Sequence, residues 1–408
     1  MDPDPKQDPL RVEMLIVPRV GAVVPGVDPR SVPWRMLDAD GMDVGFAGAW
    51  LQDLWVSGYS PGTLRSYAYD LLGWLRFLDA VQVEWTAASR EDVRDWVLWH
   101  RVRGNSQRQR KDVEGRPPAG SVNVKTGKSY LSGSYSKAYI NHMLSSVSGF
   151  YDFAVEAGMG PLRNPVPKAR RVLSADNGWA AAPARVLPKR APYRQKIPEK
   201  APRALSDELY DEVFAALRST RDRALIAVAV GAGLRASELL SMQRGRLWAD
   251  SFTAEVTPKG NHDGDRVLVP IPPPAFVWIA RYLAERPVGP PDEPVWMTVQ
   301  GLPRPLTYWA LRQVLERVNR VVGTNVTMHD LRHTFCMRLA ADESMSMTDM
   351  QHLMRHVSIS STQTYLRPRM DDLVAKLQEH WNRPPAPAPM PATGYDPDDL
   401  RILFGGTL

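Results

Sequence analysis

A basic, proline-rich stretch over residues 161–203 divides the chain of 408 residues into two parts. It holds 11 Lys and Arg against 2 Asp and Glu, and its apolar residues follow no periodic pattern. Apolar periodicity is the main local signal for a helix or a strand, so a stretch without it predicts a linker. Because 408 residues also exceed what one hydrophobic core usually organises, we expect a folded domain on each side.

The part before the linker predicts a small helical module. Apolar side chains recur at helical spacing over residues 46–55. Ser60 followed by Pro61 marks the start of a second helix, because serine is a favoured N-cap and proline suits the first helical position. Two more helices are expected over 89–100 and 134–158.

Two segments of this part have no helical period. Residues 1–40 are rich in Pro, Asp and Val and predict an irregular N-terminal arm. Residues 104–133 are rich in Gly, Ser, Arg and Lys and predict an inserted basic loop, and the stretch 101–130 holds 8 Lys and Arg against 2 Asp and Glu. Concentrated positive charge indicates a polyanion binder such as a nucleic-acid-binding protein, and a solvated basic loop is the alternative.

The part after the linker predicts helices around a small β-structure. Ser206 is the expected cap of its first helix, residues 223–230 are apolar nearly all round and predict a buried helix, and residues 252–271 predict a β-hairpin. Further helices are expected over 274–285, 307–321, 328–341, 347–355 and 371–382.

The expected fold class is therefore mainly α, with an all-helical N-terminal domain and an α+β domain that contains a small antiparallel sheet. We place the helical domain at 41–162, the basic linker at 163–204, the α+β domain at 205–382 and a proline-rich tail at 383–408.

Composition narrows the class of protein. The single cysteine, Cys336, cannot form an internal disulfide, which indicates either a reducing compartment or one whose redox state does not matter to the fold. No stretch approaches the ~20 apolar residues of a membrane span, and the N-terminus does not resemble a secretory signal. We expect a cytoplasmic protein with no membrane partner.

Two sets of polar residues in the second domain are not explained by hydrophobic patterning. Arg235 and Glu238 follow the buried helix, where the simple interpretation is a structural salt bridge. Lys259 lies at the expected hairpin tip, where most lysines are merely solvated, although a mobile loop can deliver an ammonium group to a bound substrate.

Two further sets follow. His329 and Arg332 share a helix face at i and i+3, whereas His329 and His333 have the i, i+4 spacing of a helical zinc pair. The zinc alternative is weak, because Asp330 replaces the glutamate that the motif requires and no third ligand is evident. His356 precedes Tyr365 by nine positions, and Tyr365 taken alone is more typical of a core tyrosine.

Taken in order, these residues resemble the tyrosine recombinases, the phage integrase family. The resemblance spans about residues 45–382 and is most specific in the segments GLRASELL, HDLRHTF and HVSISSTQTYL. It implies that the helical domain is the family's SAM-like core-binding domain and that the second domain is catalytic. The implied catalytic set is Arg235, Lys259, His329, Arg332, His356 and Tyr365.

The resemblance also implies a mechanism without a metal ion or cofactor. Tyr365 would attack a DNA phosphodiester and form a 3′-phosphotyrosine, while Arg235 and Arg332 hold the phosphate. His329 would be the general base, Lys259 the general acid, and His356 a phosphate hydrogen-bond partner. The family usually has glycine where this chain has Arg355, which predicts either a different turn or an added phosphate contact.

The expected role is a site-specific recombinase or integrase of a mobile element or phage that acts on double-stranded DNA as a homotetramer, with an accessory directionality factor as a further partner. A transposase or chromosome resolvase of the same family is the first alternative. A type IB topoisomerase, a non-catalytic DNA-binding regulator and a zinc hydrolase are more distant ones. The apolar stripe of the helix over 371–381 suggests docking on a neighbouring protomer, with packing on its own domain as the alternative.

Overall fold

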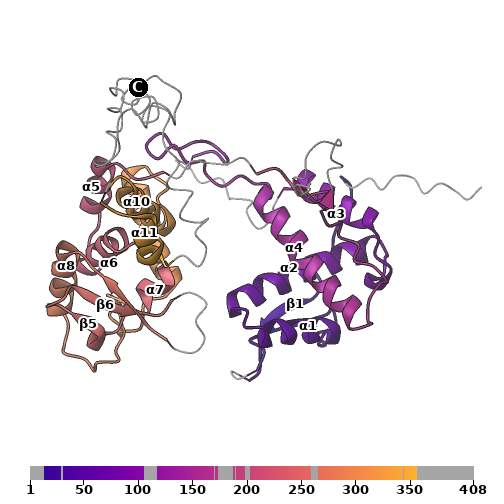
Figure 1. Cartoon of the computed structure of the whole chain (residues 1–408), viewed down its shortest axis with the longest axis horizontal. Coiled ribbons are helices and arrows are strands. Elements are labelled where there is room, and N and C mark those ends of the chain that lie inside the picture. Colours follow the sequence, from indigo (N-terminus) through magenta and orange to yellow (C-terminus); the bar gives the residue numbers. More distant parts are fainter. Residues whose placement is uncertain are drawn as a thin grey trace, which may run out of the picture.

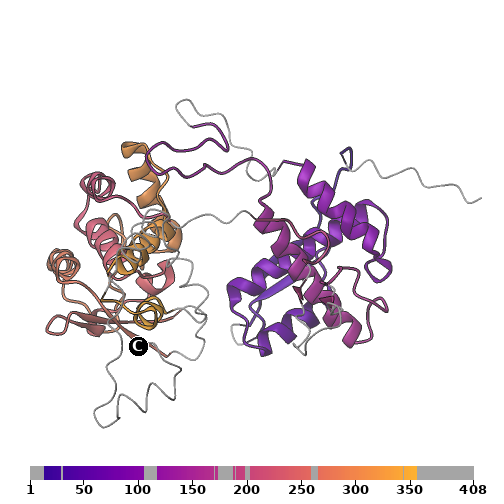
Figure 2. The same ribbon diagram turned by 45° about the horizontal axis from the view of Figure 1, so that its top comes forward.

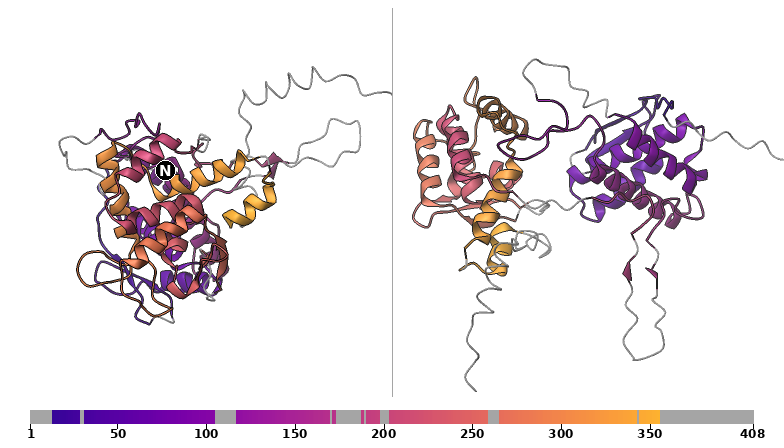
Figure 3. Two further views of the ribbon diagram at one scale, coloured as in Figure 1. Left: turned by 90° about the vertical axis from the view of Figure 1, so that its left-hand side faces the viewer. Right: turned by 90° about the horizontal axis from the view of Figure 1, so that it is seen from above.

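The computed structural model of the protein contains two bodies (Figure 1). It describes residues 13–28, 31–104, 117–169, 190–197, 203–258, 265–342 and 344–355, and the backbone of 171–172 and 187–188. The separation of the bodies is also visible from above in Figure 3. Each body has its own hydrophobic cluster, so we call residues up to 197 the N-terminal unit and residues 203–355 the C-terminal unit.

The described part of the N-terminal unit contains four α-helices, as the sequence predicts. They are α1 (Gly45–Val56), α2 (Pro61–Ala80), α3 (Arg90–Val102) and α4 (Lys137–Glu156). The side chain of Ser60 accepts a hydrogen bond from the Thr63 N–H, and Ser89 forms a capping box with Asp92, so the expected caps are confirmed. The core of this unit is aromatic and includes the fully buried Trp50, Trp74 and Trp96.

The expectation of an irregular arm over residues 1–40 is wrong for part of its length. Strands β1 (Ala22–Pro25) and β2 (Trp34–Leu37) pair antiparallel and contact α2. Val23 and Met36 are buried in the core of the N-terminal unit, which makes the hairpin part of that unit. The reason lies in the length of the strands: each has four residues, of which one is buried, so no repeating apolar pattern marks them in the sequence.

The C-terminal unit combines a three-stranded antiparallel sheet with helices, as expected. Strands β5 (Leu247–Trp248), β6 (Thr253–Val256) and β7 (Val267–Pro270) are ordered β5-β6-β7. The helices are α5 (Asp207–Ala215), α6 (Thr220–Gly231), α7 (Ala236–Leu240), α8 (Pro273–Ala284), α9 (Tyr308–Val322), α10 (Met328–Ala340) and α11 (Met347–Met354).

Helix α6 lies at the centre of this unit. Its residues from Ala224 to Val230 are buried, and it packs against both α8 and α10. This arrangement places the turn after α6 beside α10, the two segments in which the sequence predicts functional arginines.

The expected linker is not wholly irregular. Its backbone forms a short antiparallel pair, β3 (Arg171–Val172) with β4 (Leu187–Pro188). The expected helix over 371–382 and the tail at 383–408 lie outside the described residues. No helix in the described part of the chain is long and apolar enough to cross a membrane.

Candidate functional site

The turn between α6 and α7 brings Arg235 to the surface of α10. Gly233 has a left-handed backbone with φ +58°, and a Cβ atom there would lie 2.2 Å from the ring of Phe335 on α10. Only glycine satisfies both the backbone conformation and this close approach. Gly233 therefore lets the turn pack directly against α10, so that Arg235 and Arg332 lie in one cluster.

Glu238 is the centre of this cluster and is fully buried. Its Oε1 accepts a hydrogen bond of 2.7 Å from Nη1 of Arg235, and its Oε2 accepts one of 3.0 Å from the Arg235 backbone N–H. Nη1 of Arg332 lies 3.8 Å from Oε2. The salt bridge that the sequence suggested is confirmed, and the same contact orients the Arg235 side chain.

Arg355 is a third guanidinium in the cluster, and the expectation that it forces a different turn is wrong. It keeps the left-handed conformation that glycine favours, with φ 52° and ψ 46°. Its Nη2 lies 3.0 Å from Oε2 of Glu238, its Nη1 donates to the carbonyl of Leu353 at 2.6 Å, and only 9% of its side chain is exposed. Arg355 therefore binds the carboxylate of Glu238 instead of altering the turn or facing outward toward a phosphate.

The two expected phosphate-binding arginines differ in exposure. The Arg332 guanidinium is buried and donates from Nη1 to the carbonyl of Gly233 at 2.5 Å and from Nη2 to the carbonyl of Met354. The Arg235 side chain is 28% exposed and donates weakly, at 3.4 Å, to the carbonyl of Arg355. Arg235 is thus the more accessible of the two to an incoming anion.

Burial and neighbouring charge set the protonation states. Burial, together with the positive charge of Arg235, lowers the pKa of Arg332 to about 10, so the side chain is still charged at neutral pH. Burial alone would raise the pKa of Glu238, but Arg355 and Arg235 outweigh that effect and lower it, so the carboxylate is ionised. Three arginines around one carboxylate leave a net positive site, which suits an anionic substrate.

His329 lies on the first turn of α10 and is open to solvent. Partial desolvation of the ring and the positive charges of Arg332 and Lys128 lower its pKa, which outweighs the opposite effect of Asp330. A lowered pKa keeps the imidazole neutral at neutral pH, the form that can accept a proton.

His333 stacks edge-on against His329, with the ring centroids 4.0 Å apart. Burial, together with His329, lowers the pKa of His333 to about 4. Within the described residues, no group of three or more His, Cys, Asp or Glu side chains could hold a metal ion. The histidine pair therefore has no third ligand among these residues.

Three of the six predicted site residues, Arg235, His329 and Arg332, meet at this cluster. Lys259, His356 and Tyr365 lie outside the described residues. The sequence did not predict the pairing of Arg355 with Glu238; its only signal was an arginine where the family usually has glycine.

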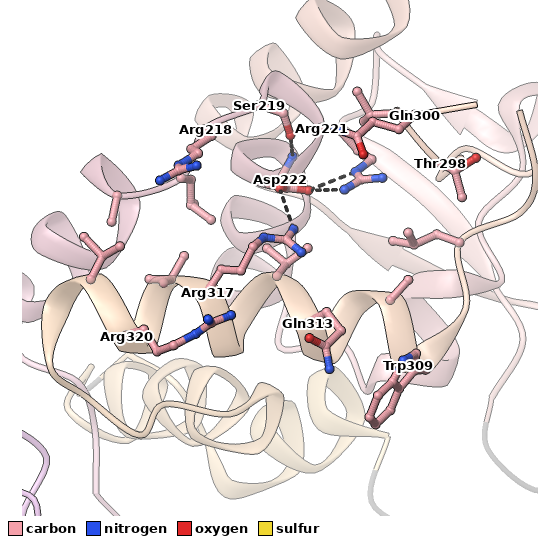
Figure 4. A pocket seen from close by; sticks show the side chains of 18 residues that line it. Arg218, Ser219, Arg221, Asp222, Thr298, Gln300, Trp309, Gln313, Arg317 and Arg320 are labelled. Atoms are coloured by element: carbon pink, nitrogen blue, oxygen red, sulfur yellow. Dashed lines mark hydrogen bonds and ion pairs between the residues drawn. The ribbon is translucent and has the colours of Figure 1, made fainter. Parts of the chain in front are cut away.

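A separate hollow of about 780 Å³ lies between the turn from α5 to α6, residues 298–300 and one face of α9 (Figure 4). At its wall, Nη2 of Arg221 lies 2.6 Å from Oδ1 of Asp222, and Arg317 from α9 lies 3.8 Å from the other oxygen of that carboxylate. None of Arg235, His329 or Arg332 lines this hollow.

Two family models match the chain. The model of the phage integrase family matches residues 204–371, and the model of the phage integrase N-terminal SAM-like domain matches residues 48–111. Together they cover more than half of the sequence. The chain belongs to the phage integrase family, the tyrosine recombinases.

Relatives and solved structures of this family extend the match. The chain is 26% identical over 332 residues to tyrosine recombinase XerD of Xanthomonas campestris, covering 77% of this chain and 85% of the relative. It is 32% identical over 189 residues to tyrosine recombinase XerA of Thermococcus kodakarensis, covering 45% of this chain but only 64% of that relative.

The fold of the Tn1549 transposon integrase, solved in complex with circular intermediate DNA, matches with a TM-score of 0.54. The match has 15% identity and covers 81% of this chain and 98% of that chain. At this identity the similarity concerns the fold, and it supports the mainly α architecture with a SAM-like N-terminal domain.

Proposed function

We propose that this tyrosine recombinase is a site-specific recombinase or integrase that cuts and rejoins double-stranded DNA through a 3′-phosphotyrosine on Tyr365. The observation that carries the proposal is the arginine cluster. Arg235 and Arg332 come from segments nearly 100 residues apart and are held around one buried carboxylate, beside a histidine whose pKa is lowered.

The positive charge of the cluster is complementary to the negative charge that develops in the reaction. Attack on a phosphodiester concentrates negative charge on the phosphorus-bound oxygens, and guanidinium groups stabilise it through paired N–H donors. Arg235 is accessible, and Arg332 would bind the phosphate after leaving the carbonyls of Gly233 and Met354.

The proposed chemistry balances without a metal ion. The phenol oxygen of Tyr365 bonds to phosphorus as the bond from phosphorus to the 5′ oxygen breaks, and the phenol proton passes to neutral His329. Lys259 donates a proton to the departing 5′ oxygen, and His356 donates a hydrogen bond to the phosphate. Rejoining reverses these steps with a 5′ hydroxyl of the same or a partner strand.

The two domains have different roles in this proposal. The helical domain at 41–162 and the basic linker bind the duplex, and the domain at 205–382 carries out cleavage. Four active sites are needed to recombine two duplexes, so we propose a homotetramer on DNA. A mobile element or phage is the proposed context. A resolvase or transposase of the same family is the alternative.

The decisive experiment traps the covalent intermediate on a nicked duplex that loses its 5′ hydroxyl fragment after cleavage. Wild type should give a protein–DNA adduct that survives denaturant, and Tyr365→Phe should give none. Tyr308→Phe is the matched control, because Tyr308 is 61% exposed on α9 in the same unit, and it should form the adduct normally.

Binding is measured in parallel. Contacts from Arg and Lys to phosphates dominate affinity for DNA, so Tyr365→Phe should bind almost as tightly as wild type. An adduct that persists in Tyr365→Phe would refute the assignment of the nucleophile. Tight binding by a wild type that never forms an adduct would instead support the non-catalytic regulator.

A further inference from the structure

A loop of the N-terminal unit reaches the C-terminal unit (Figures 1 and 2). It belongs to the connection between α3 and α4, and its tip is a tight turn, Asn123–Lys128, which we call the docking turn. An antiparallel bridge between Val122 and Ser129 and a 2.9 Å hydrogen bond from the Asn123 N–H to the Lys128 carbonyl close the turn. The structure of the turn is therefore fixed by its own backbone contacts.

Glycine and asparagine stabilise this turn internally. Gly127 has φ +59°, and its N–H donates to the Asn123 carbonyl at 2.7 Å. The side-chain oxygen of Asn123 accepts from the N–H of Thr126 at 3.0 Å. A turn that is already folded loses little conformational entropy when it docks.

The docking turn binds the connection between α9 and α10 through matched donors and acceptors. Nδ2 of Asn123 donates to the Gly323 carbonyl at 2.8 Å, and Oγ1 of Thr126 lies 2.5 Å from Oδ1 of Asn325. In return, Nδ2 of Asn325 donates to the Lys128 carbonyl at 2.9 Å. Asn123 is only 6% exposed although it belongs to a surface loop.

Two lysines of the loop form ion pairs across the same contact. Nζ of Lys128 lies 2.6 Å from Oδ2 of Asp330, which also caps the first turn of α10, and Nζ of Lys125 lies 2.5 Å from Oε2 of Glu212 on α5. The sequence suggested that positive charge in this insertion serves a polyanion. At these two positions it binds acidic groups of the C-terminal unit instead.

The end of the linker lies beside the docking turn, where the chain enters the C-terminal unit. A Cβ atom at Gly127 would lie 2.9 Å from Nη1 of Arg203, which lies at the end of the linker. The backbone N–H of Leu205 donates to Oγ1 of Thr334 on α10 at 2.9 Å. Two separate connections between the units therefore converge on α10.

We infer that the docking turn is an interdomain brace that fixes the orientation of the N-terminal unit relative to α10. A single linker leaves one unit free to rotate about the other, whereas a second attachment removes that freedom. Because α10 carries His329 and Arg332, the brace also connects the N-terminal unit to the residues of the candidate site. This inference concerns the DNA-free protein and does not depend on the proposed chemistry.

The test measures the distance between the units in the full chain without DNA. Spin labels are attached to Gln52→Cys and Ala280→Cys, two exposed positions on α1 and α8, while Cys336 is buried. Pulsed electron resonance should give one narrow distance distribution for the protein with an intact brace. Lys125→Glu should broaden it, and the double variant Lys125→Glu with Glu212→Lys should restore it.

The charge swap is informative because Lys125 and Glu212 are 43% and 51% exposed, so neither single change disrupts a core. Lys128→Ala should also broaden the distribution, and Lys137→Ala, at the exposed start of α4, should leave it unchanged. The inference would be overturned by a broad distance distribution in the labelled protein with an intact brace. It would also be overturned by a distribution that stays narrow in both Lys125→Glu and Lys128→Ala.

Discussion

Replacing Arg355 with glycine tests how the third arginine acts. The change removes the 3.0 Å contact of Nη2 with Glu238 and the 2.6 Å hydrogen bond to the Leu353 carbonyl. A hydrogen bond to a charged group contributes about 1.5–3 kcal/mol. Glycine gains about 1 kcal/mol in return, because it adopts the left-handed conformation without steric cost.

The net loss of stability should be modest for a structural reason. Breaking a buried ion pair costs about 3–5 kcal/mol when it strands a charge. Glu238 is not stranded here, since Arg235 still lies 2.7 Å from its other oxygen. Arg355→Gly should therefore lower the free energy of unfolding by about 0.5–2 kcal/mol, measured by urea denaturation.

The rate of cleavage of the nicked substrate shows whether Arg355 has a structural role or contacts the phosphate. Arg235→Ala should slow cleavage by about 10²–10³, the typical cost of losing one electrostatic stabiliser. Arg355→Gly should slow it much less, because its guanidinium is turned toward Glu238. A loss in Arg355→Gly as large as that of Arg235→Ala would refute this reasoning, as would a variant more stable than wild type.

Three further changes probe other parts of the structure. Burial lowers the pKa of His100 to about 4, so this histidine should cost about 2 kcal/mol of stability from pH 7 to pH 5 as the unfolded state takes up a proton, and His100→Phe should lose about 2 kcal/mol less than wild type over that range, as urea titrations at both pH values can check. Gly233→Ala should lower the melting temperature sharply and weaken adduct formation, because its methyl group meets Phe335; an unchanged melting temperature would contradict the packing. Lys128→Ala should raise the pKa of His329 in a histidine NMR titration, and no change would mean that the lysine is distant in solution.

The sequence by itself determined the features that depend on neighbours along the chain. Ser60, Ser89 and Ser206 cap helices where they were expected, because a cap is a contact with a backbone N–H three residues later. The division at the basic linker and the helical composition followed from local periodicity. The order of the motif residues was enough to indicate the family, and the family models agree.

Only the tertiary structure decided the features that depend on distant contacts. Strands β1 and β2 belong to the N-terminal unit because Val23 and Met36 pack on its helices, which strands this short do not indicate in advance. The Arg355 side chain binds Glu238, 117 residues earlier in the chain, and the Lys128 side chain binds Asp330, 202 residues later. A lysine or an arginine adds one positive charge wherever it lies in the sequence. Its effect depends on which group of opposite charge the fold places within a few ångströms of it.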